Sequence, residues 1–297
     1  MLVSRNGFRQ LAEVSAVLFD RVEGREVVKH ASKQTFDIHR FRQTGRSSGE
    51  MGPCRFSETE TTGSVQSKGR TIRWDLKYRP GQAANPFVLM PVELVRSGTI
   101  RAMAETLQEH LLFTGEVELD GVRYEWKDAP GMMSYFGGNR SSHSWIWGHC
   151  NQLVDEQGRL TDFIFEGMSS RPRLIGPIPG PKISCFYFNY QGKEHRLNSL
   201  WTSMRVHSNH TPLEWKFRAD TGDLSFRGQV RAQYRDFAGL TYEDTNGSLI
   251  YCSTSELSDL DIQVYRRGKL EASFKGLGTA AYEHSARVKS PYIPLLL

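Results

Sequence analysis

The feature that most constrains the fold is an alternation of apolar and polar residues with a period of two, which recurs along almost all of the 297 residues. This period places successive side chains on opposite faces of a β-strand. The expected strands are 12–19, 26–30, 35–41, 70–78, 111–118, 121–126, 144–152, 161–168, 183–190, 195–201, 213–219, 224–233, 248–254, 260–266, 269–274 and 278–284. Turns such as Asp120-Gly121 and Gln191-Gly192 separate several of them, which predicts antiparallel hairpins.

The number of strands is too large for one small barrel and suits two barrels of about eight strands each. Residues 171–182 contain four prolines and cannot form a central strand. We therefore expect two domains, 1–176 and 177–297, although a proline-rich loop within one domain would give the same pattern. A weak internal repeat supports duplication, since Phe113-x-Gly-x-Val recurs as Phe226-x-Gly-x-Val. The only expected helix is about 92–109, and Gly98 weakens it.

Composition excludes several classes of protein. No run of about 18 apolar residues exists, so no transmembrane helix is expected. The first eight residues contain no apolar stretch like that of a secretory signal, and we expect a cytoplasmic protein. The net charge of +5 is spread over 38 basic and 33 acidic residues of mixed order, so we expect no nucleic-acid partner. Weak steering of an anionic ligand is the alternative role of this charge. The sequence leaves the oligomeric state open, a homodimer included.

No metal or cofactor site is expected. The four cysteines, Cys54, Cys150, Cys185 and Cys252, form no C-x-x-C pair and are expected to be buried apolar side chains. His207 and His210 lie three residues apart, but the segment is expected to be a loop and lacks a third ligand. No phosphate loop or dinucleotide fingerprint is present.

Residues 128–151 form the most unusual segment, a Gly-rich polar loop followed by a strand. On that strand Trp145, Trp147, His149 and Asn151 share one face. Two indoles followed by an imidazole and an amide suit a ligand cavity that is apolar at depth and polar at one point. A packed core with a satisfied histidine is the alternative.

This segment resembles a known family. The residues are Phe113-x-Gly-x-Val-x-Leu-Asp120-Gly121-x-x-Tyr124, then Gly131, then Trp145-x-Trp147-Gly148-His149-Cys150-Asn151. They resemble the AttH and carotenoid-hydratase group of two-domain lipocalin-like (calycin) proteins, with tocopherol cyclase and lipocalin-type Diels–Alderases as more distant relations. The resemblance implies an all-β fold of two lipocalin-like antiparallel β-barrels in tandem, with at most one or two short helices. It also implies chemistry on hydrophobic, isoprenoid or polyene-like molecules, and it marks Trp145, Trp147, His149 and Asn151 as cavity residues.

Hydration or cyclisation of an alkene begins with protonation of a carbon atom. A carboxyl group in an apolar pocket can supply that proton, because desolvation raises its pKa. Glu166, between Phe165 and Gly167 on a strand expected to pair with 144–152, is the preferred acid, and His149 is the second catalytic candidate. Asp75 and Glu256 are alternative acids, and an ion pair with an arginine is the alternative role for Glu166.

Further residues are expected to contact the ligand. Tyr135 and Tyr187 can hydrogen-bond its polar end, and Trp74 adds an aromatic wall. We therefore expect a cofactor-independent enzyme that cyclises (a pericyclic, Diels–Alder-type reaction included) or hydrates a hydrophobic small molecule. A non-catalytic carrier or sensor of an apolar ligand is the first alternative, and a protein-interaction module with a filled core is the second.

Overall fold

The computed structural model describes residues 1–5, 10–21, 27–45, 47–82, 85–138, 141–175, 178–244 and 246–297. Antiparallel β-sheet makes up most of them, and the helices are few and short, as the alternation predicts. The start of the expected strand 26–30 and the expected domain boundary at 176/177 lie outside the described residues.

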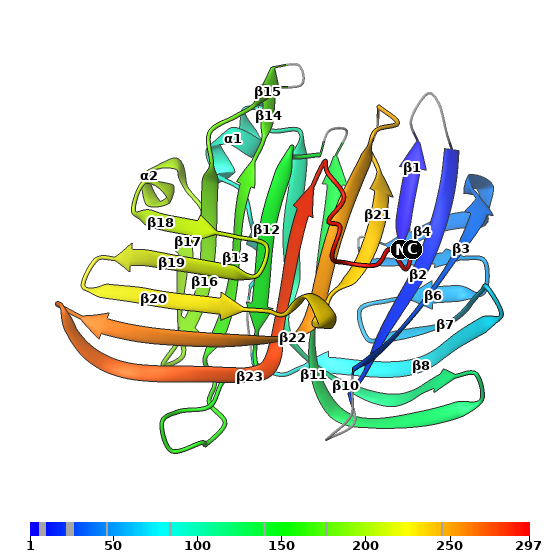
Figure 1. The fold of residues 1–297 in the computed structure, drawn as a ribbon, viewed down its shortest axis with the longest axis horizontal. Coiled ribbons are helices and arrows are strands. Elements are labelled where there is room, and N and C mark those ends of the chain that lie inside the picture. Colours follow the sequence, from blue (N-terminus) through cyan, green and yellow to red (C-terminus); the bar gives the residue numbers. More distant parts are fainter. Residues whose placement is uncertain are drawn as a thin grey trace.

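The first part of the chain forms two sheets (Figure 1, blue to green). A three-stranded sheet has the order β1-β2-β3, with β1 (Leu2–Arg5), β2 (Gln10–Asp20) and β3 (Val28–Asp37). An eight-stranded sheet has the order β11-β10-β8-β7-β6-β5-β4, and β9 pairs with β10. Its strands are β4 (Phe41–Gly45), β5 (Ser48–Met51), β6 (Cys54–Phe56), β7 (Glu60–Ser67), β8 (Arg70–Pro80), β9 (Phe87–Val88), β10 (Ala102–Leu119) and β11 (Val122–Gly138).

The second part forms one ten-stranded sheet with the order β17-β16-β13-β12-β23-β22-β20-β19-β18, in which β21 pairs with β22. Its strands are β12 (Ser144–Cys150), β13 (Ile164–Arg171), β16 (Ile183–Tyr190), β17 (Lys193–Leu197), β18 (Val206–His210), β19 (Glu214–Thr221), β20 (Leu224–Arg231), β21 (Ala238–Glu243), β22 (Leu249–Arg266) and β23 (Lys269–Ala286). A hairpin of β14 (Arg173–Ile175) and β15 (Ile178–Pro179) stands apart from it. Since β13 pairs with β16 across the proline-rich segment, the change from one large sheet to the next falls between β11 and β12.

Several expected elements differ from the structure. The helix expected over 92–109 is wrong beyond its first turn, because α1 is only Val92–Arg96 and β10 begins at Ala102. The expected strand 195–201 ends at Leu197 and is followed by α2 (Leu200–Ser203). The loop expected around His207 and His210 is the strand β18. Short 3₁₀ turns, η1 (Ile38–Arg40) and η2 (Tyr234–Asp236), complete the described elements.

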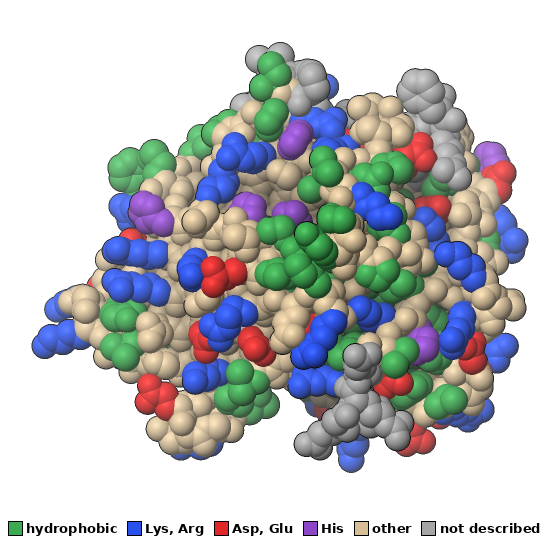
Figure 2. All heavy atoms as spheres, viewed as in Figure 1, with side chains coloured by type: hydrophobic (Ala, Val, Ile, Leu, Met, Phe, Trp, Pro, Cys, Tyr) green, Lys and Arg blue, Asp and Glu red, His purple; other side chains and the backbone are tan. Residues whose placement is uncertain are grey.

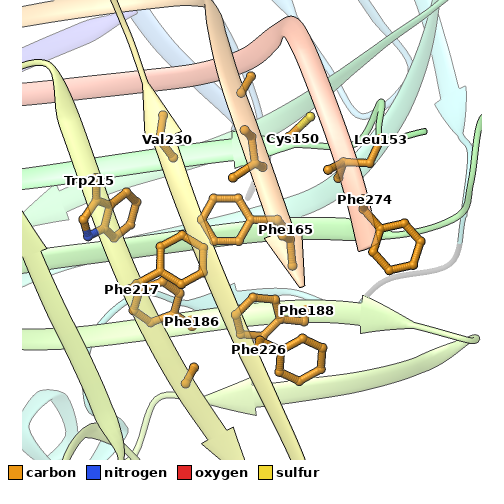
Figure 3. Close-up of a cluster of buried hydrophobic side chains, with 14 of the residues drawn as sticks. Cys150, Leu153, Phe165, Phe186, Phe188, Trp215, Phe217, Phe226, Val230 and Phe274 are labelled. Atoms are coloured by element: carbon orange, nitrogen blue, oxygen red, sulfur yellow. The ribbon is translucent and has the colours of Figure 1, made fainter. Parts of the chain in front are cut away.

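The ten-stranded sheet is curled, so that its two ends approach each other. Ser169 in β13 is hydrogen-bonded to Ser208 in β18, with 2.8 Å between the hydroxyl oxygens. Aromatic rings fill the space inside the curl (Figure 3). Phe188 stacks on Phe226 with ring centroids 4.1 Å apart, and Phe165 stacks on Phe217 at 4.9 Å. The inside of this curled sheet is therefore a packed hydrophobic core.

The N-terminal sheets have a core of their own, in which Met51, Val65 and Ile72 are buried with Trp74 packed against them. A third group of buried apolar residues, which includes Phe87, Met168 and Tyr187, joins the two halves of the molecule. The outer face of β12 and β13 contributes to this junction, with Trp145 and Trp147 packed at its side. The junction, rather than the inside of the C-terminal curl, is where the candidate site lies.

Candidate active site

The face of β12 that was singled out in the sequence points towards the N-terminal half. The strand β12 pairs with β13 on one side and with β23 on the other, and neither pairing contains a register shift. Its side chains therefore alternate regularly between the two faces, and Trp145, Trp147 and His149 lie on one of them. Ile146 and Cys150 point to the opposite face and belong to the aromatic core. His149 is buried, and the rings of Trp147 and His149 are nearly parallel, with centroids 6.3 Å apart.

Glu166 lies directly opposite His149 in the β12–β13 ladder, as expected from the pairing of these strands. Its side chain is fully buried. Oε1 accepts a hydrogen bond from the Trp147 indole N–H at 2.9 Å and another from the Thr106 hydroxyl at 2.7 Å. These hydrogen bonds connect β13 to β12 and to β10. The described contacts of Glu166 do not include the ion pair with an arginine that was the alternative role for this residue.

A second carboxyl group, that of Glu109 in β10, completes the site. Glu109 is fully buried, and its Oε2 lies 3.6 Å from His149 Nε2. The backbone carbonyl oxygen of Glu109 accepts hydrogen bonds from His149 Nε2 at 3.0 Å and from Asn151 Nδ2 at 3.2 Å. A carbonyl oxygen only accepts, so His149 carries its proton on Nε2 and leaves Nδ1 as an acceptor.

The two carboxyl groups favour their protonated forms. Burial raises the pKa of Glu109 well above its usual value, and the neighbouring Glu166 carboxylate raises it further. Burial also raises the pKa of Glu166, while the hydrogen bonds that it accepts from Thr106 and Trp147 oppose that rise. Two carboxyl groups in one buried site cannot both ionise easily, so we treat them as a pair that keeps one proton.

Burial has the opposite effect on the histidine. It lowers the pKa of His149 to about 4, although the hydrogen bond to the Glu109 carbonyl opposes this. His149 is therefore neutral at pH 7 and forms no ion pair with Glu109 there. The centre of the site consists of two buried carboxyl groups with raised pKa values, named here the acid pair (Glu109 and Glu166), beside a neutral imidazole.

Other expected ligand residues lie near this centre. The Trp145 indole N–H donates to Glu283 Oε1 at 2.5 Å, and the Trp145 side chain is half-buried. Tyr187 lies opposite Glu166 in the β13–β16 ladder, and its hydroxyl donates to Glu194 at 3.2 Å. The described structure thus brings Trp145, Trp147 and Tyr187 to one side of the junction.

Two expected ligand residues lie elsewhere. Trp74 on β8 packs in the N-terminal core, where its indole N–H donates to Thr61 Oγ1 at 3.1 Å. Tyr135 on β11 is exposed. The alternative acid Asp75 is exposed. The residue Glu256 is exposed as well, but the surroundings of its carboxyl group raise its pKa to about 7 through desolvation and the nearby Glu283. These four residues were chosen for local sequence context, which does not specify the face of a strand that meets the other half of the chain.

Glu109 and Thr106 were not expected in the site. Both fall in the segment that was expected to be a helix, and no signal in the sequence marks either as functional. Within the described residues no group of three or more His, Cys, Asp or Glu side chains is arranged to hold a metal ion. The four cysteines are free and buried, as expected. No helix of the described chain is long and apolar enough to cross a membrane.

Comparisons with known proteins give distant structural similarities. No protein-family model matches the chain. No curated protein matches it either. A solved structure described as AttH from Nitrosomonas europaea is similar over 98% of this chain and 84% of that chain, with 11% sequence identity and a TM-score of 0.49. Kievitone hydratase from Nectria haematococca is similar over 95% of this chain and 85% of that chain, with 9% identity and a TM-score of 0.48. These solved structures are what this chain is similar to in the path of its backbone, and they assign no role to any of its residues.

Proposed function

We propose that this protein is a cofactor-independent, hydratase-like enzyme that protonates a carbon–carbon double bond of a hydrophobic, isoprenoid- or polyene-like molecule. Addition of water or closure of a ring would follow. The observation that carries this proposal is the acid pair, two fully buried carboxyl groups with raised pKa values beside a neutral histidine. A purely structural junction has no need to bury two carboxyl groups together, since each costs free energy that apolar side chains would not.

The chemistry uses the proton that the acid pair retains. The π electrons of the alkene form a new C–H bond with this proton, the O–H bond of the carboxyl breaks, and a carbocation and a carboxylate remain. In hydration, a water oxygen bonds to the cation and the carboxylate takes up the released proton, so the pair is regenerated. In cyclisation, a second double bond of the same molecule attacks the cation, and loss of a proton to the pair ends the reaction.

The surrounding side chains suit these steps. The hydrogen bonds from Thr106 and Trp147 to Glu166 Oε1 stabilise the negative charge that protonation of the substrate leaves behind. Indole faces, such as those of Trp145 and Trp147, stabilise a nearby cation through their π electrons. His149 is fixed by its hydrogen bond to the Glu109 carbonyl and offers a neutral nitrogen that can accept a proton from water.

The test is incubation of the full chain with a panel of prenylated phenols and polyenes, analysed by mass spectrometry. Hydration in H₂¹⁸O places one ¹⁸O atom in the product, and cyclisation in D₂O places one deuterium on carbon. Glu166→Gln should lower turnover by a factor on the order of 10²–10⁴, the usual contribution of a general acid. The exposed Glu125→Gln removes the same charge and should leave turnover unchanged.

Ligand affinity, measured by quenching of tryptophan fluorescence, should be nearly the same in Glu166→Gln and in the wild type. Equal turnover in the two would exclude Glu166 from the mechanism. Tight binding of panel members with no turnover by the wild type would favour the alternative of a carrier or sensor of an apolar ligand.

A further inference from the structure

A pocket with a volume of about 350 Å³ lies at one end of β12, and neither residue of the acid pair lines it. Its walls come from β12, β13, β18 and β23 and from the segment that leads into β16. Six basic side chains line it, namely His143, Arg171, Lys182, His210, His284 and Arg287. Figure 2 shows histidine, lysine and arginine side chains gathered over this part of the molecule.

The described residues that line this pocket include positively charged but no negatively charged side chains. Behind the wall, Asp244 pairs with Arg287 at 2.7 Å and lies 3.5 Å from Arg173. The described contacts of Arg171 and Lys182 are with the carbonyl oxygens of Gly180 and Ser208, which are polar but uncharged.

The pKa values of two histidines in the pocket are lowered, in part by the neighbouring positive charges. The pKa of His143 is lowered by burial and then by the guanidinium groups of Arg173, Arg287 and Arg171. The pKa of His210 is lowered by burial and then by His284, Lys182 and Arg171. In addition, His143 Nδ1 is buried and has no hydrogen-bond partner among the described residues. A negatively charged group in the pocket would raise the pKa values of both histidines and would give His143 Nδ1 a hydrogen-bond partner.

Four serines and three apolar residues form the rest of the pocket. The half-buried Trp145 forms part of it, as do Ala286 and the exposed Val288. Trp145 lies two residues before Trp147 on the same face of β12, so an apolar group that enters past Trp145 moves towards the junction between the two halves.

We propose that this pocket binds an amphiphilic organic anion, whose carboxylate or phosphate group contacts Arg171 and Lys182 and whose apolar body lies against Trp145. Both anions present several oxygen acceptors, which is the chemistry that guanidinium and ammonium groups recognise. The site is distinct from the acid pair, and binding there does not require the protein to be an enzyme.

The experiment is isothermal titration calorimetry of the full chain with octanoate, octyl phosphate, octan-1-ol and inorganic phosphate. One or both octyl anions should bind, and a comparison of their affinities distinguishes a site for a carboxylate from a site for a phosphate group. Octan-1-ol lacks the charge and inorganic phosphate lacks the apolar body, so each should bind at least about tenfold more weakly, the factor that corresponds to loss of one good charge-assisted contact.

The variant that tests the charge is Arg171→Gln with Lys182→Gln. Its matched control is Arg79→Gln with Lys275→Gln, which removes the same charge from exposed positions outside the pocket. The pocket variant should lose at least about tenfold in affinity for the octyl anions, and the control should keep the wild-type affinity. Equal affinities in these two variants, or equal binding of octan-1-ol and octanoate, would overturn the proposal.

Glu166→Gln separates this proposal from the proposed enzymatic function. It should bind the octyl anions as the wild type does, even though turnover is lost. Loss of anion binding in Glu166→Gln would place the ligand at the acid pair instead and overturn a distinct site.

Discussion

The indole N–H of Trp147 donates a hydrogen bond to Oε1 of Glu166 at 2.9 Å, across the β12–β13 ladder. Trp147 is half-buried, whereas Glu166 is fully buried. The indole therefore forms part of the apolar wall of the junction and, through its N–H, stabilises the carboxylate form of the acid pair. Because these two roles reside in different atoms of one ring, they can be separated by substitution.

Trp147→Phe keeps an aromatic face and removes the N–H donor. Without this hydrogen bond the carboxylate form of Glu166 is less favoured, so the pKa of the acid pair should rise. The alkaline limb of the pH profile of turnover should move to higher pH, and the free energy of unfolding should fall by about 1 kcal/mol. An unchanged limb, measured on whichever panel substrate the wild type converts, would contradict a role of this hydrogen bond in the acid pair.

Stability should depend on pH through the acid pair itself. The folded-state pKa values of Glu109 and Glu166 are raised, so between about pH 4.5 and those values the folded state binds more protons than the unfolded state. The stability that the bound proton gives is present below pH 4.5 and is lost as pH rises, with a slope of about 1.4 kcal/mol per pH unit for one proton.

Glu109→Gln should reduce this dependence, because only Glu166 then remains to bind a proton in the folded state. Denaturant titrations between pH 5 and 8 should show a stability that falls less steeply with pH in this variant than in the wild type. The exposed Glu125→Gln serves as control and should follow the wild type. Parallel curves for the wild type and Glu109→Gln would mean that the pair does not hold its proton.

The parts of the site on β12 and β13 could be predicted from the sequence, because successive side chains alternate strictly between the two faces of these strands. The ladder is regular from Ser144 to Cys150, so the period of two correctly places Trp145, Trp147 and His149 on one face. The position of Glu166 opposite His149 follows once these two strands pair.

Glu109 could not be predicted in the same way. The segment that contains it is rich in good helix formers, yet β10 forms there because β8, β9 and β11 pair with it along its length. The β10–β11 register also shifts between Gln108 and Leu111. Across such a bulge, alternation no longer specifies the direction of a side chain, and tertiary pairing overrides local propensity.

His149 should destabilise the protein in acid. Its pKa is lowered to about 4 in the folded state, against 6.5 for an ordinary histidine. The folded state favours the neutral ring, so this contribution to stability is present above pH 6.5 and is lost as pH falls towards 4, by about 3 kcal/mol in total. His149→Gln, which can still donate to the Glu109 carbonyl, should lack this loss, as seen by comparing its free energy of unfolding with that of the wild type over this range.

The exposed His39→Gln is the matched control for that comparison. Its stability should follow the wild-type curve at every pH. A His149→Gln curve that also runs parallel to the wild type would show that His149 becomes protonated in the folded state as easily as in the unfolded state.

Gly167 and Gly148, which face each other across β13 and β12, should differ in their tolerance of a methyl group. A Cβ atom on Gly167 would lie 2.7 Å from the Phe186 ring and 3.0 Å from Trp215, and both rings are fully buried in the aromatic core. A Cβ atom on Gly148 would lie 3.3 Å from its nearest neighbours. Since rings held on all sides cannot move aside, Gly167→Ala should cost about 1–3 kcal/mol of unfolding free energy, and Gly148→Ala should cost less. Denaturant titration of both variants checks this order, and the reverse order would show that the aromatic core has room beside Gly167.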